Sequence, residues 1–243
     1  MVGRYLHTAV IFIWVVLMTF IFGLAATFAS FFSKTGNFPH LIARTWARSI
    51  LFISRVKVSV TGYSNIDPLK SYIYMSNHQS NFDIPVLLGR LPVQFRWLAK
   101  AELFKIPIFG RGMRGCGYIS IDRSNRKSAF ESLARAARTI REGVSVLIFP
   151  EGTRSQDGSI RDFKKGGFVL AVDAGVPIVP VVIHGTWAIM PRNRLRIDPT
   201  DVVLEIKKPI DTAAYTRKTK DELLAKIRQS ICESFEKKRS EEP

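Results

Sequence analysis

The chain has 243 residues, 47% of them hydrophobic, and its 36 Lys and Arg against 20 Asp and Glu give a net charge of +16. This length allows one large domain, or one domain with an appendage, and provides enough apolar residues for a core. The charge predicts an anionic partner, which would be nucleic acid, acidic lipid or a phosphorylated substrate. The two cysteines, Cys116 and Cys232, lie far apart and indicate neither a disulfide framework nor a zinc site.

The N-terminal region predicts a membrane anchor. No Asp, Glu, Lys or Arg occurs from Tyr5 to Ser33, and residues 10–32 are almost continuously apolar. As a helix this run would reach about 35 Å, enough to cross a hydrocarbon core or to enter it obliquely. A cleaved signal peptide is the alternative, although the run exceeds the usual hydrophobic stretch of such a peptide. The anchor favours lipid over nucleic acid as the anionic partner.

A second apolar segment, residues 38–54, contains Arg44, Trp46 and Arg48. Long cationic side chains and an aromatic ring in an apolar helix are typical of a helix in the headgroup layer. An ordinary surface helix of the globular domain is the alternative. We therefore assign residues 1–54 to the membrane anchor.

The charge distribution predicts the side of the membrane. Arg4 is the one Lys or Arg residue before the anchor, whereas Lys and Arg are frequent after it. Because cytoplasmic flanks carry the excess of Lys and Arg, we expect the main domain at the cytoplasmic face of the inner (plasma) membrane.

Residues 55–243 predict an α/β domain with a mixed, largely parallel sheet flanked by helices. Apolar, β-branched runs alternate with segments of helical periodicity, as in such sheets. One helix is expected to begin at Ser124 and to bury Phe130, and the last helix to follow a capping box at Thr219. Strands are predicted at residues 57–61, 71–76, 95–99, 118–121, 144–149, 177–183 and 202–206.

A histidine and a carboxylate, His78 and Asp83, lie five residues apart after the strand at 71–76. Within a helix they would point about 140° apart, so the pair can meet only across a turn. If His78 follows a strand and Asp83 begins a helix, the carboxylate holds one ring nitrogen and leaves the other free to accept a proton. The alternative is a helix N-cap beside a hydrogen-bonded loop residue. Ser80 is expected to brace this loop rather than to act as a nucleophile.

The loop at residues 149–155 follows another apolar strand, at an end of the sheet where α/β folds bind ligands. Gly152 permits close backbone approach, and the forked guanidinium of Arg154 suits a phosphate. Glu151 is expected to hold Arg154 in place. A solvated turn with a surface ion pair is the alternative.

A glycine-rich stretch, residues 110–115, fits the pattern GxGxxG. It leads into a strand rather than a helix, which argues against a dinucleotide site. We expect a loop instead, in which the glycines let Arg111 and Arg114 pass close to an anionic group.

Together these segments resemble the glycerolipid acyltransferases, specifically the 1-acyl-sn-glycerol-3-phosphate (lysophosphatidic acid) acyltransferases. The resemblance extends from about residue 57 to 210, and the chain departs from it at Ser120, where the family often has Phe. The matching blocks are His78 with Asp83 in an Asn-His-x4-Asp pattern; Gly117, Asp122 and Arg123; the unchanged Phe-Pro-Glu-Gly-Thr-Arg at 149–154; and the proline-bracketed strand at 176–183.

The resemblance implies transfer of a fatty acyl group to the 2-hydroxyl of 1-acyl-sn-glycerol 3-phosphate, which gives phosphatidic acid in phospholipid biosynthesis. The co-substrate would be acyl-CoA or acyl carrier protein, with no metal and no other cofactor. His78 would be the general base, and Asp83 would orient it. The protein would act at an anionic membrane surface and would not bind nucleic acid. Substrate-binding candidates are Lys100, Arg123, Glu151, Gly152, Thr153 and Arg154.

Two alternatives remain open at this point. The acceptor could be another molecule, such as a lyso-ornithine lipid or glycerol 3-phosphate. The chain could also be a membrane-tethered protein that binds anionic lipid without catalysis, which would not need the His78 and Asp83 pair.

Overall fold

The computed structural model describes residues 2–122 and 124–241. Within these residues one seven-stranded sheet has the order β1-β7-β6-β2-β5-β3-β4, and only β6 and β7 pair antiparallel. The predicted mixed, largely parallel sheet is confirmed. Its strands are β1 (Val58–Thr61), β2 (Ile73–Ser76), β3 (Phe95–Lys100), β4 (Ile119–Ile121), β5 (Ser145–Ile148), β6 (Ile178–His184) and β7 (Val202–Ile206).

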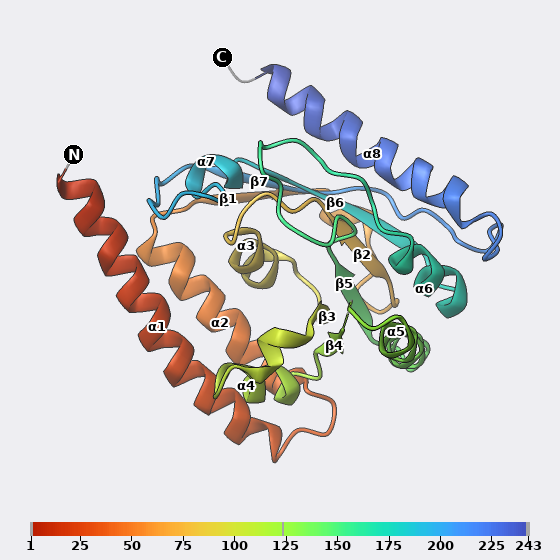
Figure 1. Cartoon of the computed structure of the whole chain (residues 1–243), viewed down its shortest axis with the longest axis horizontal. Helices are drawn as coiled ribbons and strands as arrows, with labels where there is room; N and C mark the ends of the chain where they lie inside the picture. The colour runs from red at the N-terminus through yellow and green to blue at the C-terminus, as the bar shows by residue number, and fades with distance from the viewer. Residues whose placement is uncertain (1, 123, 242–243) are drawn as a thin grey trace.

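Helices cover both faces of the sheet, so the domain has three layers (Figure 1). One face packs against α2 (Asn37–Ile53) and α3 (Asp83–Arg90), with α1 (Val2–Ser30) and α4 (Phe109–Gly115) beside them. The other face packs against α5 (Arg126–Arg141), α6 (Gly166–Ala174) and α8 (Lys220–Glu241). A short helix, α7 (Thr186–Ile189), follows β6, and 3-10 turns occupy Tyr63–Asn65 and Ala101–Lys105.

The central strands position the site. Every residue of β2, β5 and β6 is buried, as expected for β-branched strands with helices on both faces. Both β5 and β6 run parallel to β2. The chain therefore leaves all three strands at the same edge of the sheet, where side chains from distant parts of the sequence meet.

The first two helices form an antiparallel pair along one side of the domain (Figure 1). One helix among the described residues, Gly3–Ser30, is long and apolar enough to cross a membrane, with a mean hydropathy of 2.6. It begins before the predicted run at 10–32. It also ends before that run does, because residues 31–36 form the turn into α2. Trp46 donates a hydrogen bond to Thr19 at 3.1 Å, which ties the two helices together.

The glycine-rich stretch is helix α4, so the expectation of a loop was wrong. Its glycines serve close packing, because a Cβ at Gly112 would lie only 3.3 Å from the carbonyl oxygen of Gly23 on α1. Small residues at a helix crossing allow such close approach of two backbones. A strand follows α4, as the sequence indicated.

Two predicted helix caps also need correction. The side chain of Asn125, not Ser124, accepts the first-turn N–H of α5, at 3.1 Å, while Ser124 bonds a preceding carboxylate. Phe130, expected on the buried face of α5, is 51% exposed. The hydroxyl of Thr219 accepts from the N–H of Thr216 at 2.9 Å instead of joining a capping box. Local hydrogen bonds to short polar side chains decide these ends.

Candidate active site

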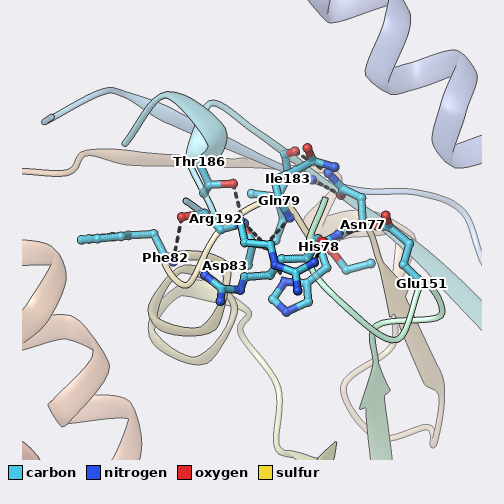
Figure 2. Close-up of polar contacts among 12 residues, drawn as sticks. Asn77, His78, Gln79, Phe82, Asp83, Glu151, Ile183, Thr186 and Arg192 are labelled. Carbon is cyan, nitrogen blue, oxygen red and sulfur yellow. Dashed lines mark hydrogen bonds and ion pairs between the residues drawn. The ribbon is translucent and has the colours of Figure 1, made fainter. Parts of the chain in front are cut away.

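The centre of the site is the buried carboxylate of Asp83, at the first position of α3 (Figure 2). Its Oδ2 accepts hydrogen bonds from Nδ1 of His78 at 2.8 Å and from the backbone N–H groups of Gln79 at 2.6 Å and Ser80 at 2.9 Å. Its Oδ1 accepts from the hydroxyl of Thr186 at 2.5 Å. The pair predicted to meet across a turn is thus in direct contact.

These donors define the state of the His78 ring. A carboxylate that already accepts two backbone N–H groups at one oxygen offers no proton there, so Nδ1 of His78 carries the hydrogen. Nε2 is then an acceptor, and it has no hydrogen-bond partner in the described part of the chain. The ring stacks on Phe149, with centroids 3.9 Å apart, and 14% of the side chain is exposed. The arrangement is that of a base with one reachable nitrogen.

The loop after β5 holds the backbone of His78. Oε1 of Glu151 accepts the N–H of His78 at 2.6 Å, and Oε2 accepts the N–H of Arg161 at 2.8 Å. The carbonyl of His78 accepts the N–H of Ser155 at 2.8 Å. Glu151 points into the protein and is 1% exposed. The expectation that it holds Arg154 was therefore wrong, because backbone donors occupy both of its oxygens.

Burial shapes the charge of Glu151. Loss of water, with a smaller contribution from the charge of nearby Asp83, raises the pKa of this carboxyl from 4.5 to about 7, although the two backbone donors oppose the rise. The carboxyl group of Glu151 therefore changes charge near neutral pH, directly behind the loop that carries His78.

Strand β6 and the segment after it brace the same region. The side chain of Asn77 forms two hydrogen bonds with the backbone of Ile183, at 2.9 and 2.8 Å. The hydroxyl of Ser80 donates to the carbonyl of Met190 at 2.8 Å and is fully buried. Ser80 therefore braces the loop, as expected, and its position excludes it as a nucleophile.

Beside His78 lies a cavity of about 390 Å³. Its lining is mainly apolar and comes from α1, α2, α3, α4 and β3, and the charged groups among the described lining residues are Lys100 and Arg154. Of the predicted site residues, the cavity brings together His78, Lys100, Gly152, Thr153 and Arg154. Asp83 and Glu151 lie behind His78 and support it, whereas Arg123 lies outside the described residues.

Two of these predicted binding residues have clear local roles. Gly152 has a φ of 75°, a left-handed conformation that favours glycine, so the loop can turn tightly at this point. Lys100, at the end of β3, forms an exposed ion pair with Glu102 at 2.9 Å. A pair of this kind is weak and can open when an anionic ligand competes for the lysine.

One cation of the site, Arg192, was not predicted from the sequence. It lies after α7, and its Nη1 is 3.5 Å from the carbonyl oxygen of Arg154, so it contacts the backbone of the loop after β5. Burial lowers the pKa of the Arg154 guanidinium, and the positive charge of Arg192 lowers it further. Arg196, by contrast, binds Asp198 at 2.8 Å. The signal that could have found Arg192 is its place after a strand that ends at the ligand-binding edge.

Thr186 was also not predicted, and its bond to Asp83 generates a testable expectation. We expect Thr186→Val to lower kcat about 10- to 100-fold, because a buried carboxylate loses one charge-assisted hydrogen bond and can turn away from His78. Thr186→Ser should restore most of the rate, since it keeps the hydroxyl. Steady-state kinetics of both variants provide the measurement, and equal rates for Val and Ser would contradict the positioning role.

The raised pKa of Glu151 predicts a pH-dependent stability. The folded chain holds this proton more tightly than the unfolded chain, so stability should fall as pH rises from about 4.5 to about 7. In Glu151→Gln this fall should be smaller, although the overall Tm should drop because an amide NH₂ then faces a backbone donor. Thermal unfolding in detergent between these pH values tests this, with the exposed Glu142→Gln as control. Parallel curves for wild type and Glu151→Gln would refute the assignment.

Comparisons with known proteins agree with this geometry. The chain resembles a 1-acyl-sn-glycerol-3-phosphate acyltransferase, BAT2, of Brassica napus chloroplasts, with 38% identity over 201 residues, which are 82% of this chain and 56% of that protein. A protein of the same enzyme name from Borreliella burgdorferi is 30% identical over 196 residues, which are 81% of this chain and 78% of that one. The chain spans about half the length of the plant relatives.

A solved structure gives the same fold. The crystal structure of the 1-acyl-sn-glycerophosphate (LPA) acyltransferase PlsC from Thermotoga maritima superposes with a TM-score of 0.83 at 28% identity, over 98% of this chain and 97% of that one. The sequence model of the family described as Acyltransferase matches residues 57–184, which include His78, Asp83, Glu151 and Arg154. The chain belongs to the acyltransferase family.

Proposed function

We propose that the chain transfers a fatty acyl group from an acyl thioester to the 2-hydroxyl of 1-acyl-sn-glycerol 3-phosphate, which gives phosphatidic acid. The thioester would be acyl-CoA or acyl carrier protein. The observation that carries the proposal is the His78 ring, held at Nδ1 by buried Asp83 and facing an apolar cavity beside Arg154. The names of the relatives support this acceptor.

The chemistry needs one base that later acts as an acid. Nε2 of His78 accepts the proton of the 2-hydroxyl while the oxygen attacks the thioester carbonyl carbon. The tetrahedral intermediate then loses the thiolate as the C–S bond breaks, and the imidazolium returns its proton to the sulfur. The ester and a free thiol result, with no acyl-enzyme and no metal or other cofactor in the scheme. General base catalysis typically contributes about 10²- to 10⁴-fold, so positioning of the substrates supplies much of the rest.

The two ends of the acceptor require different surroundings. The apolar cavity suits an acyl chain, since each buried methylene group contributes about 0.8 kcal/mol. The phosphate requires cations. Arg154 lines the same cavity as His78, and Arg192 contacts the backbone of Arg154, so these two guanidinium groups are the candidates to bind it. Lys100 lines the same cavity and is available to the phosphate or to the donor. A contribution of Arg123 stays a prediction from the family resemblance.

The helix pair supports a site at a membrane surface. Large apolar side chains of α1, including Ile13, Val16 and Phe28, are exposed to the outside, as is Phe31 just after it. An acceptor that lives in the bilayer and a soluble thioester can both reach a site held at this surface. The excess of Lys and Arg after α1 supports a location at the cytoplasmic face of the membrane.

We expect His78→Ala to abolish acyl transfer, because no other described group lining the cavity offers an imidazole to the hydroxyl. The assay uses a labelled acyl thioester with lysophosphatidate, glycerol 3-phosphate and a lyso-ornithine lipid as acceptors. His7→Ala, which removes an imidazole outside the cavity, serves as control, together with membrane flotation of each variant. More than a few per cent of residual turnover would reject the base, and no turnover by wild type with any acceptor would favour a lipid-binding protein.

The two arginines should act on binding of the acceptor. We expect Arg154→Ala and Arg192→Ala each to raise the KM for lysophosphatidate about tenfold, with a smaller loss of kcat, because each removes one charge-assisted contact to the phosphate. Arg194→Ala is the matched control, since Asp198 already binds that guanidinium at 3.2 Å. A raised KM for acyl-CoA alone, absent with acyl carrier protein, would assign the arginines to the donor instead.

A further inference from the structure

The turn between α1 and α2 lies next to the end of α4 (Figure 1). A second cationic hollow is formed there, away from His78 and Asp83. It has a volume of about 400 Å³, and its charged lining residues are Lys34, Arg111 and Arg114. The other described lining residues are Ser, Thr and Gly, and none is a carboxylate. It shares no lining residue with the catalytic cavity. The hollow therefore offers positive charge and small polar groups to an anion.

Two chain segments fix this hollow. Gly36 has a φ of 72°, and a Cβ there would lie 2.8 Å from the carbonyl group of Cys116, so the turn and the end of α4 are in close contact. Arg114 donates to the carbonyl of Phe104 at 2.7 Å. The side chains of Lys34 and Arg111 have no hydrogen bond or ion pair with any residue that the structure describes. Two of the three cations are thus free to bind a ligand.

Hydrogen-bond capping of the helix ends does not account for these cations. Both α1 and α4 end at this hollow, and a cation near a helix C-terminus stabilises it by about 0.3–1 kcal/mol. The last carbonyl groups of α1, however, already accept the N–H groups of Phe31, Phe32 and Ser33. Those of α4 accept the N–H groups of residues 116–118. The side chains of Lys34 and Arg111 are therefore not required as caps.

Aromatic side chains next to the hollow indicate what surrounds it. Phe28, Phe31, Phe32 and Phe38 are each more than half exposed, and Phe28 and Phe32 are in edge contact, with centroids 5.3 Å apart. Aromatic rings gather at the boundary between headgroups and acyl chains, where their apolar area leaves water. Insertion of these rings into a membrane would hold the hollow at the depth of the lipid phosphate groups. A free phosphate in solution would gain nothing from them.

We propose that this hollow binds the headgroup phosphate of an anionic membrane phospholipid that is not the acyl acceptor. The phosphate lies between Lys34 and Arg111, with the hydroxyl groups of Ser33 and Thr35 as neutral donors. The bound lipid fixes the turn between α1 and α2 against the membrane surface. This binding does not depend on acyl transfer, so it can be tested whether or not the proposed reaction is correct.

The test uses the full chain in detergent micelles, with phosphatidylglycerol or phosphatidylcholine added and the rise in Tm recorded against lipid concentration. Wild type should bind phosphatidylglycerol at least about tenfold more tightly than Lys34→Gln/Arg111→Gln, since each cation near a lipid surface contributes about 1 kcal/mol. The exposed pair Lys218→Gln/Lys226→Gln removes the same charge near or on α8 and should behave as wild type.

Two more variants distinguish this hollow from the catalytic cavity as the place where the lipid binds. Arg154→Ala should leave the effect of phosphatidylglycerol intact, because that arginine belongs to the catalytic cavity. Lys34→Arg/Arg111→Lys, which keeps both charges, should retain binding. Equal affinity of wild type and Lys34→Gln/Arg111→Gln, or equal stabilisation by phosphatidylcholine, would overturn the proposal. Equally tight binding of free glycerol 3-phosphate would overturn the lipid assignment, and loss of the effect in Arg154→Ala would assign the lipid to the catalytic cavity.

Discussion

The candidate active site depends on a single buried carboxylate, that of Asp83, with donors on both of its oxygens. Three of them come from the loop after β2, and the fourth, Thr186, comes from a segment 103 residues later in the chain. Burying an ionised group is costly unless its oxygens are satisfied, so these donors are a condition for the carboxylate to remain charged inside the protein. The charge in turn fixes the tautomer of His78, and with it the nitrogen that is able to accept a proton.

The parallel sheet is what brings the donors together. The loops after β2, β5 and β6 leave the sheet at one edge. The loops after β5 and β6 each contribute a contact to the loop after β2, which carries His78 and Ser80. Glu151 holds the N–H of His78 from the second loop, while Met190 accepts the hydroxyl of Ser80 from the third. The position of the imidazole is thus determined by backbone geometry in three segments, and its chemistry by one side chain.

The N-terminal helices do more than tether the domain. They provide part of the wall of the cavity beside His78, so the apolar surface of α1 and this cavity are built from the same helices. The Lys and Arg side chains of the protein also differ in whether a carboxylate binds them. Some cations are neutralised by carboxylates such as Asp198 and Asp173, whereas Arg154, Arg192, Lys34 and Arg111 face a cavity or solvent without a bound carboxylate among the described residues. These unneutralised groups are the ones suited to phosphates of lipids.

The sequence by itself determined the strands, the α/β class, the apolar N-terminal helix and the meeting of His78 with Asp83, because local periodicity and a five-residue spacing leave few other geometries. Only the tertiary structure decided that Thr186 holds Asp83, that Glu151 binds backbone N–H groups rather than Arg154, and that Arg192 contacts the backbone of Arg154. It also turned the expected loop at 110–115 into a helix, since contact with Gly23 on α1 outweighs the weak helical preference of glycine. These features join segments far apart in the chain, and spacing along a sequence carries no information about which distant loops the sheet brings to one edge.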